Sequence, residues 1–553
     1  MTSSRRTRLW LASLLAWALS PAPLPAAIVQ TGNVSPNVST WTSITTGYIG
    51  QTSDGSVTVD AGSLLASGNV NLSPHSNSTG TATVTGAGSK WTNTSELTIG
   101  GRGVGSLNIE AGGEVSNAGG AIGHGPNSTG TARVTGDGSK WTIHRYDLTV
   151  GSFGNGMLAV EAGGLVISAQ TRIGDDSGST GTAVVTGAGS KWTNSSLLSI
   201  GYNGAGTLAI DAGGLVSTVS GRLGESSGST GTATVSGAGS KWTNSSQLTI
   251  GGKGVGTLTI KAGGLVTAST SSNTSFLGYD SGSTGTATVT GAGSKWTNSG
   301  DLYVGHVGVG TLTVEAGGEV ANTGGTIGFE SRSTGTAMVT GANSKWTNRG
   351  GLNVNRGTLT IEDGGLVSVG EALAISSIWN SSINMTTGGM LALYGNADDS
   401  LSQFLGLVQG TDAIRFWDDS VSDWAPLASA TFGEDYTLEY LSSGDLAGYT
   451  LLTVGDASSP VVAGDFNADG SVDGTDFLTW QRGESPDPLG EGSLTAWKTH
   501  FGTSASGAGS GIAAEASATV PEPTASALAL LLPLVGRQRH AAKEKQRRLA
   551  AAS

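Results

Sequence analysis

The sequence lacks cysteine altogether, and charged residues make up only 12% of its 553 positions. Disulfide bonds therefore cannot stabilise the fold, which must rest on hydrogen-bonded ladders and stacked apolar side chains. Basic residues are concentrated near the two ends of the chain, and the formal net charge is −13. Because a chain body with a net negative charge repels phosphate backbones, we expect no nucleic-acid partner.

Glycine is abundant, with 91 residues, and 37% of the chain is hydrophobic. This balance differs from that of an ordinary globular domain and indicates a turn-rich, repetitive β protein. Val, Ile and Leu recur at regular places and can bury a core, which argues against a disordered chain. We therefore expect the repetitive segment to fold.

Tryptophan marks a long internal period. Successive tryptophans recur at nearly equal intervals along the chain, at Trp41, Trp91, Trp141, Trp192, Trp242, Trp296 and Trp346. The later six lie in blocks similar to S-T-G-T-A-T-V-T-G-A-G-S-K-W-T-N around Trp91. Self-similarity at a fixed period of this length is the signature of a repeat architecture.

Each copy of the repeat is divided into two halves, because equivalent glycines recur at half the interval between the tryptophans, as at Gly55, Gly80 and Gly105. One half is longer than the others, between Gly256 and Gly285. Each half offers three short strands, for example 81–85, 89–92 and 97–99, with apolar residues at alternate positions. This pattern predicts an all-β fold over residues 28–395, a three-sided parallel β-solenoid (β-helix) of about fourteen coils. The alternative is a seven-bladed propeller, but a blade has no reason to repeat its own first half.

The blocks G-S-T-G-T-A-T-V-T-G-A-G-S-K-W-T-N and G-T-L-T-I-E-A-G-G-L-V resemble the repeat shared by autotransporter passenger domains and PEP-CTERM proteins. The resemblance covers roughly residues 36–370. It implies a β-helical rod, secreted or held at the cell surface, without an assigned catalytic activity.

The alternation within each strand assigns side chains to the inside or the outside of the solenoid. In Ser89-Lys90-Trp91-Thr92, the lysine belongs in solvent, so we expect the tryptophan to fill the interior. We expect an outer basic ladder of Lys90, Lys140, Lys191, Lys241, Lys295 and Lys345. We also expect an acidic ladder of Asp60, Glu110, Glu161, Asp211, Glu315 and Glu362, interrupted by Lys261.

An enzymatic β-helix needs a single constellation of residues that breaks the repeat, such as a pair of carboxylates. Here the acidic residues recur with the repeat, and His75, His124, His144 and His306 are isolated in the sequence. The G-x-S-x-G match at 224–228 is predicted to be turn chemistry, because equivalent turns replace its central serine. We therefore predict no enzymatic activity and no catalytic residues. The best candidate for a break is the longer coil, with its insertion at 270–274.

After the repeat, residues 396–459 lose the period and gain aromatic residues, which predicts a small β-rich capping module. Residues 460–503 contain a predicted calcium loop in a short α-helical module. Its six ligand positions hold Asp465, Asn467, Asp469, Ser471, Asp473 and Asp476, where Ser471 contributes its carbonyl oxygen. Gly470 allows the sharp turn at the sixth position.

Asp476 in the twelfth position, followed by Phe477, Leu478 and Trp480, makes this loop resemble a dockerin repeat. The resemblance covers most of 460–503 and implies bound calcium and a cohesin-like protein partner. The second half, 490–501, retains Leu494, Trp497 and Phe501 of a helix but no second loop.

The two ends of the chain carry targeting signals. Residues 1–27 combine arginines, an apolar run and small residues, as in a Sec-type signal peptide. A Gly/Ser/Ala linker at 504–519 leads to Val520-Pro521-Glu522-Pro523, an apolar segment and a basic tail, which together resemble a PEP-CTERM sorting signal over 520–553. That resemblance implies processing by an exosortase-type enzyme. The apolar run of 525–535 is short for a permanent span, so we expect only transient membrane contact.

Together these features predict a secreted, non-enzymatic structural or adhesive protein of the cell envelope surface or extracellular matrix, with an extracellular polysaccharide as a further candidate partner. The alternative is a carbohydrate-binding or polysaccharide-degrading β-helix, either a lyase or a glycosidase.

Overall fold

The computed structural model describes residues 27–269, 274–395, 400–418, 420–455, 464–467, 471–482 and 491–502. The chain divides into two units, residues 1–455 and 456–553, which are described separately below. The predicted linker and sorting signal, and all of the predicted signal peptide except Ala27, lie outside the described residues.

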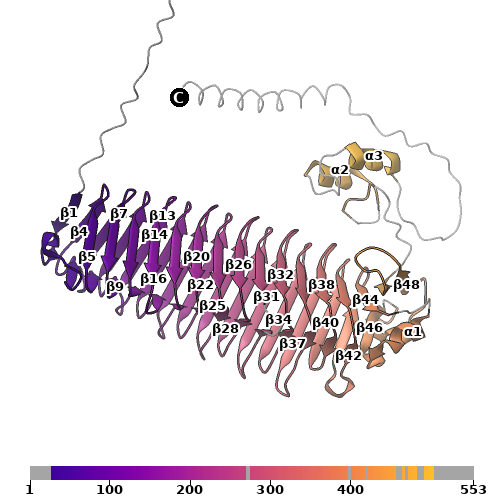
Figure 1. Cartoon of the computed structure of the whole chain (residues 1–553). Coiled ribbons are helices and arrows are strands. Elements are labelled where there is room, and N and C mark those ends of the chain that lie inside the picture. The colour runs from indigo at the N-terminus through magenta and orange to yellow at the C-terminus, as the bar shows by residue number, and fades with distance from the viewer. Residues whose placement is uncertain are drawn as a thin grey trace, which may run out of the picture. The chain divides into compact units, whose positions relative to one another are not determined.

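The first unit contains a three-sided parallel β-solenoid of about fourteen turns (Figure 1). Each turn, or coil, contributes one strand to each of three sheets, called A, C and B in chain order. Corresponding strands of successive coils pair in parallel and in register, as Gly105 with Gly130 in sheet A. The predicted all-β solenoid is therefore confirmed, and the propeller is wrong because its blades would be separate four-stranded sheets.

The strand bounds follow the repeat closely. Sheet A contains β1 (Ala27–Gly32), β4 (Gly55–Asp60), β7 (Thr79–Thr85), β10 (Val104–Glu110), β13 (Thr129–Thr135), β16 (Asn155–Glu161), β19 (Thr180–Thr186), β22 (Ala205–Asp211), β25 (Thr230–Ser236), β28 (Val255–Lys261), β31 (Thr284–Thr290), β34 (Val309–Glu315), β37 (Thr334–Thr340), β40 (Gly357–Glu362), β43 (Ser382–Met385), β46 (Ile414–Asp418) and β47 (Asp423–Pro426). Sheet B contains β2 (Val34–Ser35), β3 (Gly47–Ile49), β6 (Val70–Leu72), β9 (Glu96–Ile99), β12 (Gly119–Ile122), β15 (Leu148–Val150), β18 (Thr171–Ile173), β21 (Leu197–Ile200), β24 (Ser220–Leu223), β27 (Leu248–Ile250), β30 (Ser275–Leu277), β33 (Leu302–Val304), β36 (Gly325–Ile327), β39 (Leu352–Val354), β42 (Leu373–Ile375) and β45 (Val408–Gln409). Sheet C contains β5 (Leu64–Ser67), β8 (Lys90–Asn93), β11 (Glu114–Asn117), β14 (Lys140–Ile143), β17 (Leu165–Ser168), β20 (Lys191–Asn194), β23 (Leu215–Thr218), β26 (Lys241–Asn244), β29 (Leu265–Ala268), β32 (Lys295–Asn298), β35 (Glu319–Asn322), β38 (Lys345–Asn348), β41 (Leu366–Val369), β44 (Met390–Tyr394), β48 (Tyr436–Leu441) and β49 (Tyr449–Val454).

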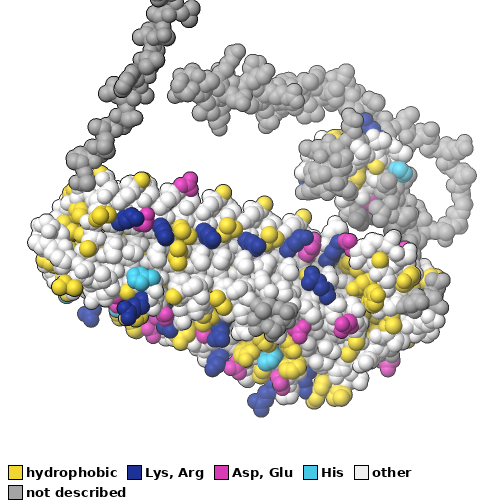
Figure 2. Space-filling model, in the orientation of Figure 1, with side chains coloured by type: hydrophobic (Ala, Val, Ile, Leu, Met, Phe, Trp, Pro, Cys, Tyr) yellow, Lys and Arg dark blue, Asp and Glu magenta, His cyan; other side chains and the backbone are white. Residues whose placement is uncertain are grey.

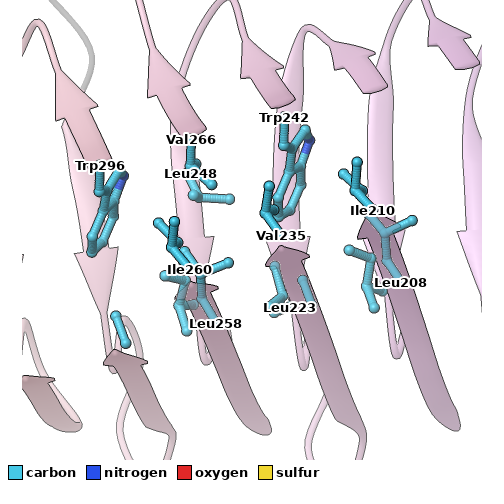
Figure 3. Close-up of a cluster of buried hydrophobic side chains, with 14 of the residues drawn as sticks. Leu208, Ile210, Leu223, Val235, Trp242, Leu248, Leu258, Ile260, Val266 and Trp296 are labelled. Carbon is cyan, nitrogen blue, oxygen red and sulfur yellow. The ribbon is translucent and has the colours of Figure 1, made fainter. Parts of the chain in front are cut away.

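The interior explains why the repeat spans two coils rather than one. A coil with a tryptophan in sheet C has an alanine in sheet A, and the next coil has valine in sheet C and leucine in sheet A. The alanines are Ala82, Ala132, Ala183, Ala233, Ala287 and Ala337, and the leucines are Leu107, Leu158, Leu208, Leu258, Leu312 and Leu359. Figure 3 shows Val266 between Trp242 and Trp296 on successive strands of sheet C. Because interiors are close-packed, the large and small side chains must compensate within each coil.

The predicted direction of the tryptophans is confirmed, since the six from Trp91 to Trp346 are at most 1% exposed. Trp41, the first of the series, is instead part of the N-terminal end of the solenoid, after the 3₁₀ helix η1 (Val38–Thr40). Its Nε1 donates a hydrogen bond of 2.8 Å to the carbonyl oxygen of Pro36.

The serine before each Lys-Trp pair stabilises the corner between sheets A and C. The Ser89 hydroxyl accepts a hydrogen bond of 3.0 Å from the Gly62 amide in the preceding coil, and five other serines do the same. Glycine at the second position of the sheet A strands is required by close approach. At Gly181 a Cβ atom would overlap the carbonyl oxygen of Val150.

Antiparallel strands cover both ends of the solenoid. At the N-terminus, β1 pairs antiparallel with β4 and β2 with β3. At the other end, β47 pairs antiparallel with β46, and β49 with β44 and β48. Helix α1 (Leu401–Gly406) buries Phe404, and the 3₁₀ helices η2 (Ser377–Trp379), η3 (Thr411–Ala413) and η4 (Leu427–Ser429) lie in the last coils. Pairing the end strands in this way covers the edges of the parallel coils, which would otherwise be open to aggregation.

The described residues of the second unit, 464–467, 471–482 and 491–502, include the helices α2 (Gly474–Gln481) and α3 (Glu491–His500). The Phe477 ring lies 5.3 Å from Trp480 and 4.9 Å from Trp497, measured between ring centroids. Trp497 also donates its indole N–H to the Asp473 carbonyl oxygen at 2.7 Å. These contacts join the first helix and the end of the predicted calcium loop to the second helix.

Candidate functional site

The outer faces of sheets A and C repeat every two coils. Figure 2 shows a spaced row of basic side chains along one side of the solenoid. The predicted lysine positions are exposed or half-buried, and two of them form ion pairs with the next coil. Lys90 lies 3.3 Å from Glu114 and Lys295 lies 2.8 Å from Glu319, both at the surface. Exposed pairs of this kind contribute about 0–1 kcal/mol each, so they add little to the stability of the solenoid.

Sheet B has an outer face that does not repeat. Along its strands from β18 to β33, the central outward position holds Arg172, Ser199, Arg222, Thr249, Phe276 and Tyr303. A second variable series, here called the B corner, follows the glycine after each of these strands and after β36. The B corner consists of Asp175, Tyr202, Glu225, Gly252, Tyr279, His306 and Phe329. Each amide from Tyr202 onward donates to the glycine carbonyl oxygen one coil earlier, as Tyr279 does to Gly251 at 2.8 Å, so the series is in register.

Three rings of the B corner stack on successive coils. Tyr279 and His306 have ring centroids 5.1 Å apart with planes inclined by 5°, and His306 and Phe329 are 5.3 Å apart with planes inclined by 12°. Phe276 and Tyr303 on sheet B contact this stack edge-on. These five rings form a surface cluster, here called the aromatic patch, in which Tyr279 remains 42% exposed and Phe329 44% exposed.

Tyr303, which contacts this stack edge-on, has a perturbed pKa. The pKa of Tyr303 is raised above its ordinary value, first by burial and then by the negative charge of Asp301. The phenol therefore stays protonated at neutral pH and retains its hydroxyl as a hydrogen-bond donor.

A charged cluster lies on the coils that precede the aromatic patch. A guanidinium nitrogen of Arg222 lies 2.9 Å from a carboxylate oxygen of Glu225. The Glu225 carboxylate also accepts a hydrogen bond from the Ser199 hydroxyl. One coil pair earlier, Arg172 lies 3.6 Å from Asp175 and its guanidinium carbon lies 4.7 Å from the centroid of the Tyr202 ring. Burial raises the pKa of Asp175, while the charge of Arg172 acts in the opposite direction.

A pocket of about 420 Å³ lies where the charged cluster meets the aromatic patch. Its lining includes Glu225, Gln247, Lys253, Phe276 and Tyr279. The pocket therefore combines an aromatic wall with donors and acceptors of hydrogen bonds, which is the arrangement expected of a small-ligand site.

The predicted calcium loop is only partly described, because Asp469 lies outside the described residues. Asp476 is fully buried, and its carboxylate accepts hydrogen bonds from the amides of Phe466, Asn467 and Asp473 at 2.7, 3.0 and 2.8 Å. The start of the loop is thus joined to the first turn of α2, and Asp476 completes a capping box with Asp473.

The carboxylate and amide oxygens of Asp465, Asn467, Asp473 and Asp476, with the Ser471 carbonyl, match the oxygen ligands that calcium prefers. Among the described residues, no group of three or more His, Cys, Asp and Glu side chains is arranged to hold a metal ion. Calcium binding at this loop stays a prediction.

For His306 and for the turn at 224–228, the structure differs from what the sequence predicts. His306 is isolated in the sequence but is the middle ring of the aromatic stack. The G-x-S-x-G match forms a turn as expected, but its Glu225 lies in the pocket rather than serving only the turn. The insertion proposed as a break in the repeat lies outside the described residues at 270–273, whereas Phe276 and Tyr279 in the same coil belong to the patch. The spacing of Tyr279, His306 and Phe329 near the coil length was the signal available in the sequence.

Among the described residues, no helix has the length and apolar character required to cross a membrane. Comparison with protein-family models, with curated proteins and with solved structures finds no match to this chain. The fold defines the class of the first unit, a three-sided parallel β-solenoid with a repetitive surface on two of its sides.

Proposed function

We propose that this chain is a secreted, non-enzymatic structural or adhesive protein of the cell surface or extracellular matrix. The observation that carries the proposal is the repetition of the outer faces of sheets A and C, where lysine, acidic and threonine positions recur at intervals of two coils. A surface that presents the same groups along its whole length is suited to repeated weak contacts with a matrix. A catalytic centre instead requires one unique arrangement of residues.

The interior supports a load-bearing role for the rod. The sheet A strands of the central coils are seven residues long and pair in register with both neighbours, as β22 does with β19 and β25. Tryptophan and leucine fill the space between the sheets. Since each coil contacts mainly its neighbours, stability grows with the number of coils and does not need disulfide bonds.

The extracellular part of the proposal rests on sequence features. These are the leader at 1–27, the dockerin-like calcium loop and the sorting signal at 520–553, which resembles that of PEP-CTERM proteins. We propose that an exosortase-type enzyme processes the tail after transient membrane contact. A cohesin-like protein is a further proposed partner of the helical module.

The aromatic patch favours one version of the alternative function, carbohydrate binding. Polysaccharide hydrolysis by glycosidases ordinarily uses two carboxylates on either side of the scissile bond. Among the described residues that line the pocket, Glu225 is the one carboxylate, and it is paired with Arg222. We therefore favour binding over degradation.

The proposal is tested by two measurements on the full chain. Incubation with a panel of polysaccharides in the presence of calcium should release no new reducing ends or unsaturated products, whereas turnover that disappears in Glu225→Gln would overturn the non-enzymatic role. Fractionation of the producing cells should place the protein in the envelope or the medium. Retention inside the cell would overturn the extracellular role.

A further inference from the structure

Gly252 interrupts the B corner at one coil. The residues before and after it in the series are Glu225 and Tyr279, which carry side chains outward, whereas Gly252 has none. Coils are spaced by about 4.8 Å, so Glu225 and Tyr279 are about 9.6 Å apart along the solenoid. The missing side chain leaves a slot one coil wide, which opens into the 420 Å³ pocket.

The slot has one flat aromatic wall. The Tyr279 ring is covered on one side by His306 from the next coil, with the two planes inclined by 5°. Its other side is directed toward the coil of Gly252, which has no side chain at the corner position, and both residues line the pocket. The Phe276 ring packs edge-on against Tyr279, with ring centroids 4.8 Å apart, and thereby fixes the orientation of the Tyr279 ring.

The remaining walls are polar. Arg222 and Glu225 form the opposite wall as an ion pair of 2.9 Å, and Gln247 and Lys253 also line the pocket. These groups supply both donors and acceptors. The charges of Arg222 and Glu225 offset each other, which leaves Lys253 as the one further charge of the described lining, and its ammonium group can also donate hydrogen bonds to the hydroxyl groups of a neutral ligand.

We propose that the slot at Gly252 binds a hexopyranose unit of a neutral extracellular polysaccharide. A pyranose ring has apolar C–H faces that stack on an aromatic ring, and hydroxyl groups around its rim that both donate and accept hydrogen bonds. About 9.6 Å between flanking side-chain positions admits one such ring between Tyr279 and Glu225. This inference rests on the proposed adhesive function and names its ligand class and its location.

The same argument disfavours a peptide or a second copy of the chain as the occupant. The slot is one coil wide and lined mainly by polar groups, whereas protein interfaces need about 800 Å² from each partner and an apolar centre. Tyr303 and Phe329 extend the aromatic surface over the following coils, which suits further sugar units of a linear chain.

The test is affinity gel electrophoresis of the full chain in gels containing hydroxyethyl cellulose, galactomannan, laminarin or polygalacturonate. We expect retardation by at least one of the three neutral polysaccharides. Tyr279→Ala should reduce the affinity at least tenfold, while Tyr279→Trp should retain it. Tyr440→Ala, which removes an exposed tyrosine of β48, is the matched control and should bind like the wild type.

A second variant fills the slot without removing any contacting side chain. Gly252→Tyr should abolish retardation, and it should fold, because Tyr202 and Tyr279 occupy the same corner position in other coils and Gly252 lacks a positive φ. A Cβ atom at Gly252 would lie 3.1 Å from the Glu225 carbonyl oxygen, which requires only a small shift. Circular dichroism verifies folding.

The proposal is overturned if no neutral polysaccharide retards the wild type, if polygalacturonate alone does so, or if Gly252→Tyr and Tyr279→Ala bind unchanged. Such results leave the extracellular, non-enzymatic role to be judged by turnover and fractionation alone.

Discussion

The Nε1 atom of Trp141 donates a hydrogen bond of 2.6 Å to Oδ1 of Asn117, a buried residue in the preceding coil. Ser67, Ser168 and Asn322 accept the equivalent bond from Trp91, Trp192 and Trp346. The indole nitrogens of Trp242 and Trp296 are buried without a hydrogen-bond partner. At the position equivalent to Asn117, the Trp296 coil is preceded by Ala268, which offers no side-chain acceptor.

Ala268→Ser should therefore stabilise the coil of Trp296. A serine hydroxyl would accept the buried N–H, and a satisfied hydrogen bond is worth about 1 kcal/mol while an unsatisfied buried group costs about 1–3 kcal/mol. Amide hydrogen exchange of β29 and β32 measures the local opening free energy, which should rise. Ala337→Ser is the control, because its hydroxyl would lie between Leu312 and Leu359 and should lower stability. A decrease for Ala268→Ser would contradict the assignment.

Because large and small side chains of sheets A and C compensate for each other in volume, we predict that two residues of one coil are coupled in their contribution to stability. Trp296→Val should cost about 3–5 kcal/mol because it leaves a cavity, and Ala287→Leu alone should cost about 1–3 kcal/mol through overpacking. The double variant should be more stable than the sum of these costs predicts, by about 0.5–3 kcal/mol. Trp296→Val combined with Ala183→Leu, in a distant coil, should be additive. Additivity in both cycles would show that the coil does not conserve its volume.

Calcium binding should be detectable by titration calorimetry on the full chain. We expect saturable uptake of one ion at micromolar to millimolar concentration, since loops with oxygen ligands span about that range. Asp469→Ala should remove this uptake, because the fifth loop position is a ligand. Asp423→Ala, on β47, is the control carboxylate and should leave the titration unchanged. Absence of any calcium-dependent heat would refute the dockerin-like assignment.

The start of α2 should depend on pH through Asp473. The pKa of Asp473 is lowered first by a hydrogen bond of 2.6 Å from the Thr475 hydroxyl and then by the Thr475 amide. A carboxyl whose pKa is lower in the folded state stabilises that state above the unfolded pKa of about 3.9, and this contribution is lost as the pH falls through the folded pKa. Thr475→Val should raise the pKa of Asp473, as measured by carboxyl NMR titration. Asp418, whose pKa is lowered by Ser420, should titrate as before.

The sequence alone predicts the solenoid because the same residue pattern recurs in every coil or every second coil. Alternating apolar residues around Ala82 and Trp91, and glycines at fixed offsets, leave few other folds. The ends were harder to predict, since the antiparallel pairing of β49 with β44 joins segments that are distant in the sequence and share no pattern. Likewise Trp41 carries the period but lies outside sheet C, because its segment forms the N-terminal end.

The aromatic patch was not predicted because its members share no single residue type, and the near-coil spacing of Tyr279, His306 and Phe329 is also that of the ordinary turn residues in the other coils. The interval from Tyr279 to His306 is longer than the usual coil and that from His306 to Phe329 is shorter, because the intervening turns vary in length. In the fold, backbone pairing between coils aligns these residues despite the different intervals, and the centroids of neighbouring rings lie within 5.3 Å of each other. Register in the sheet, rather than counting along the sequence, decides which corner residues meet.

The alternation of Ala82 and Leu107 with Trp91 and Val115 also restricts how the length of the solenoid can change. Removing the single coil from Val104 to Ser128 would place Trp91 next to Trp141 and Ala82 next to Ala132, crowding one side of the interior and leaving gaps on the other. Removing two adjacent coils together would restore the order of large and small side chains. Gene duplication or loss should therefore change this protein in steps of two coils, about 9.6 Å of length each.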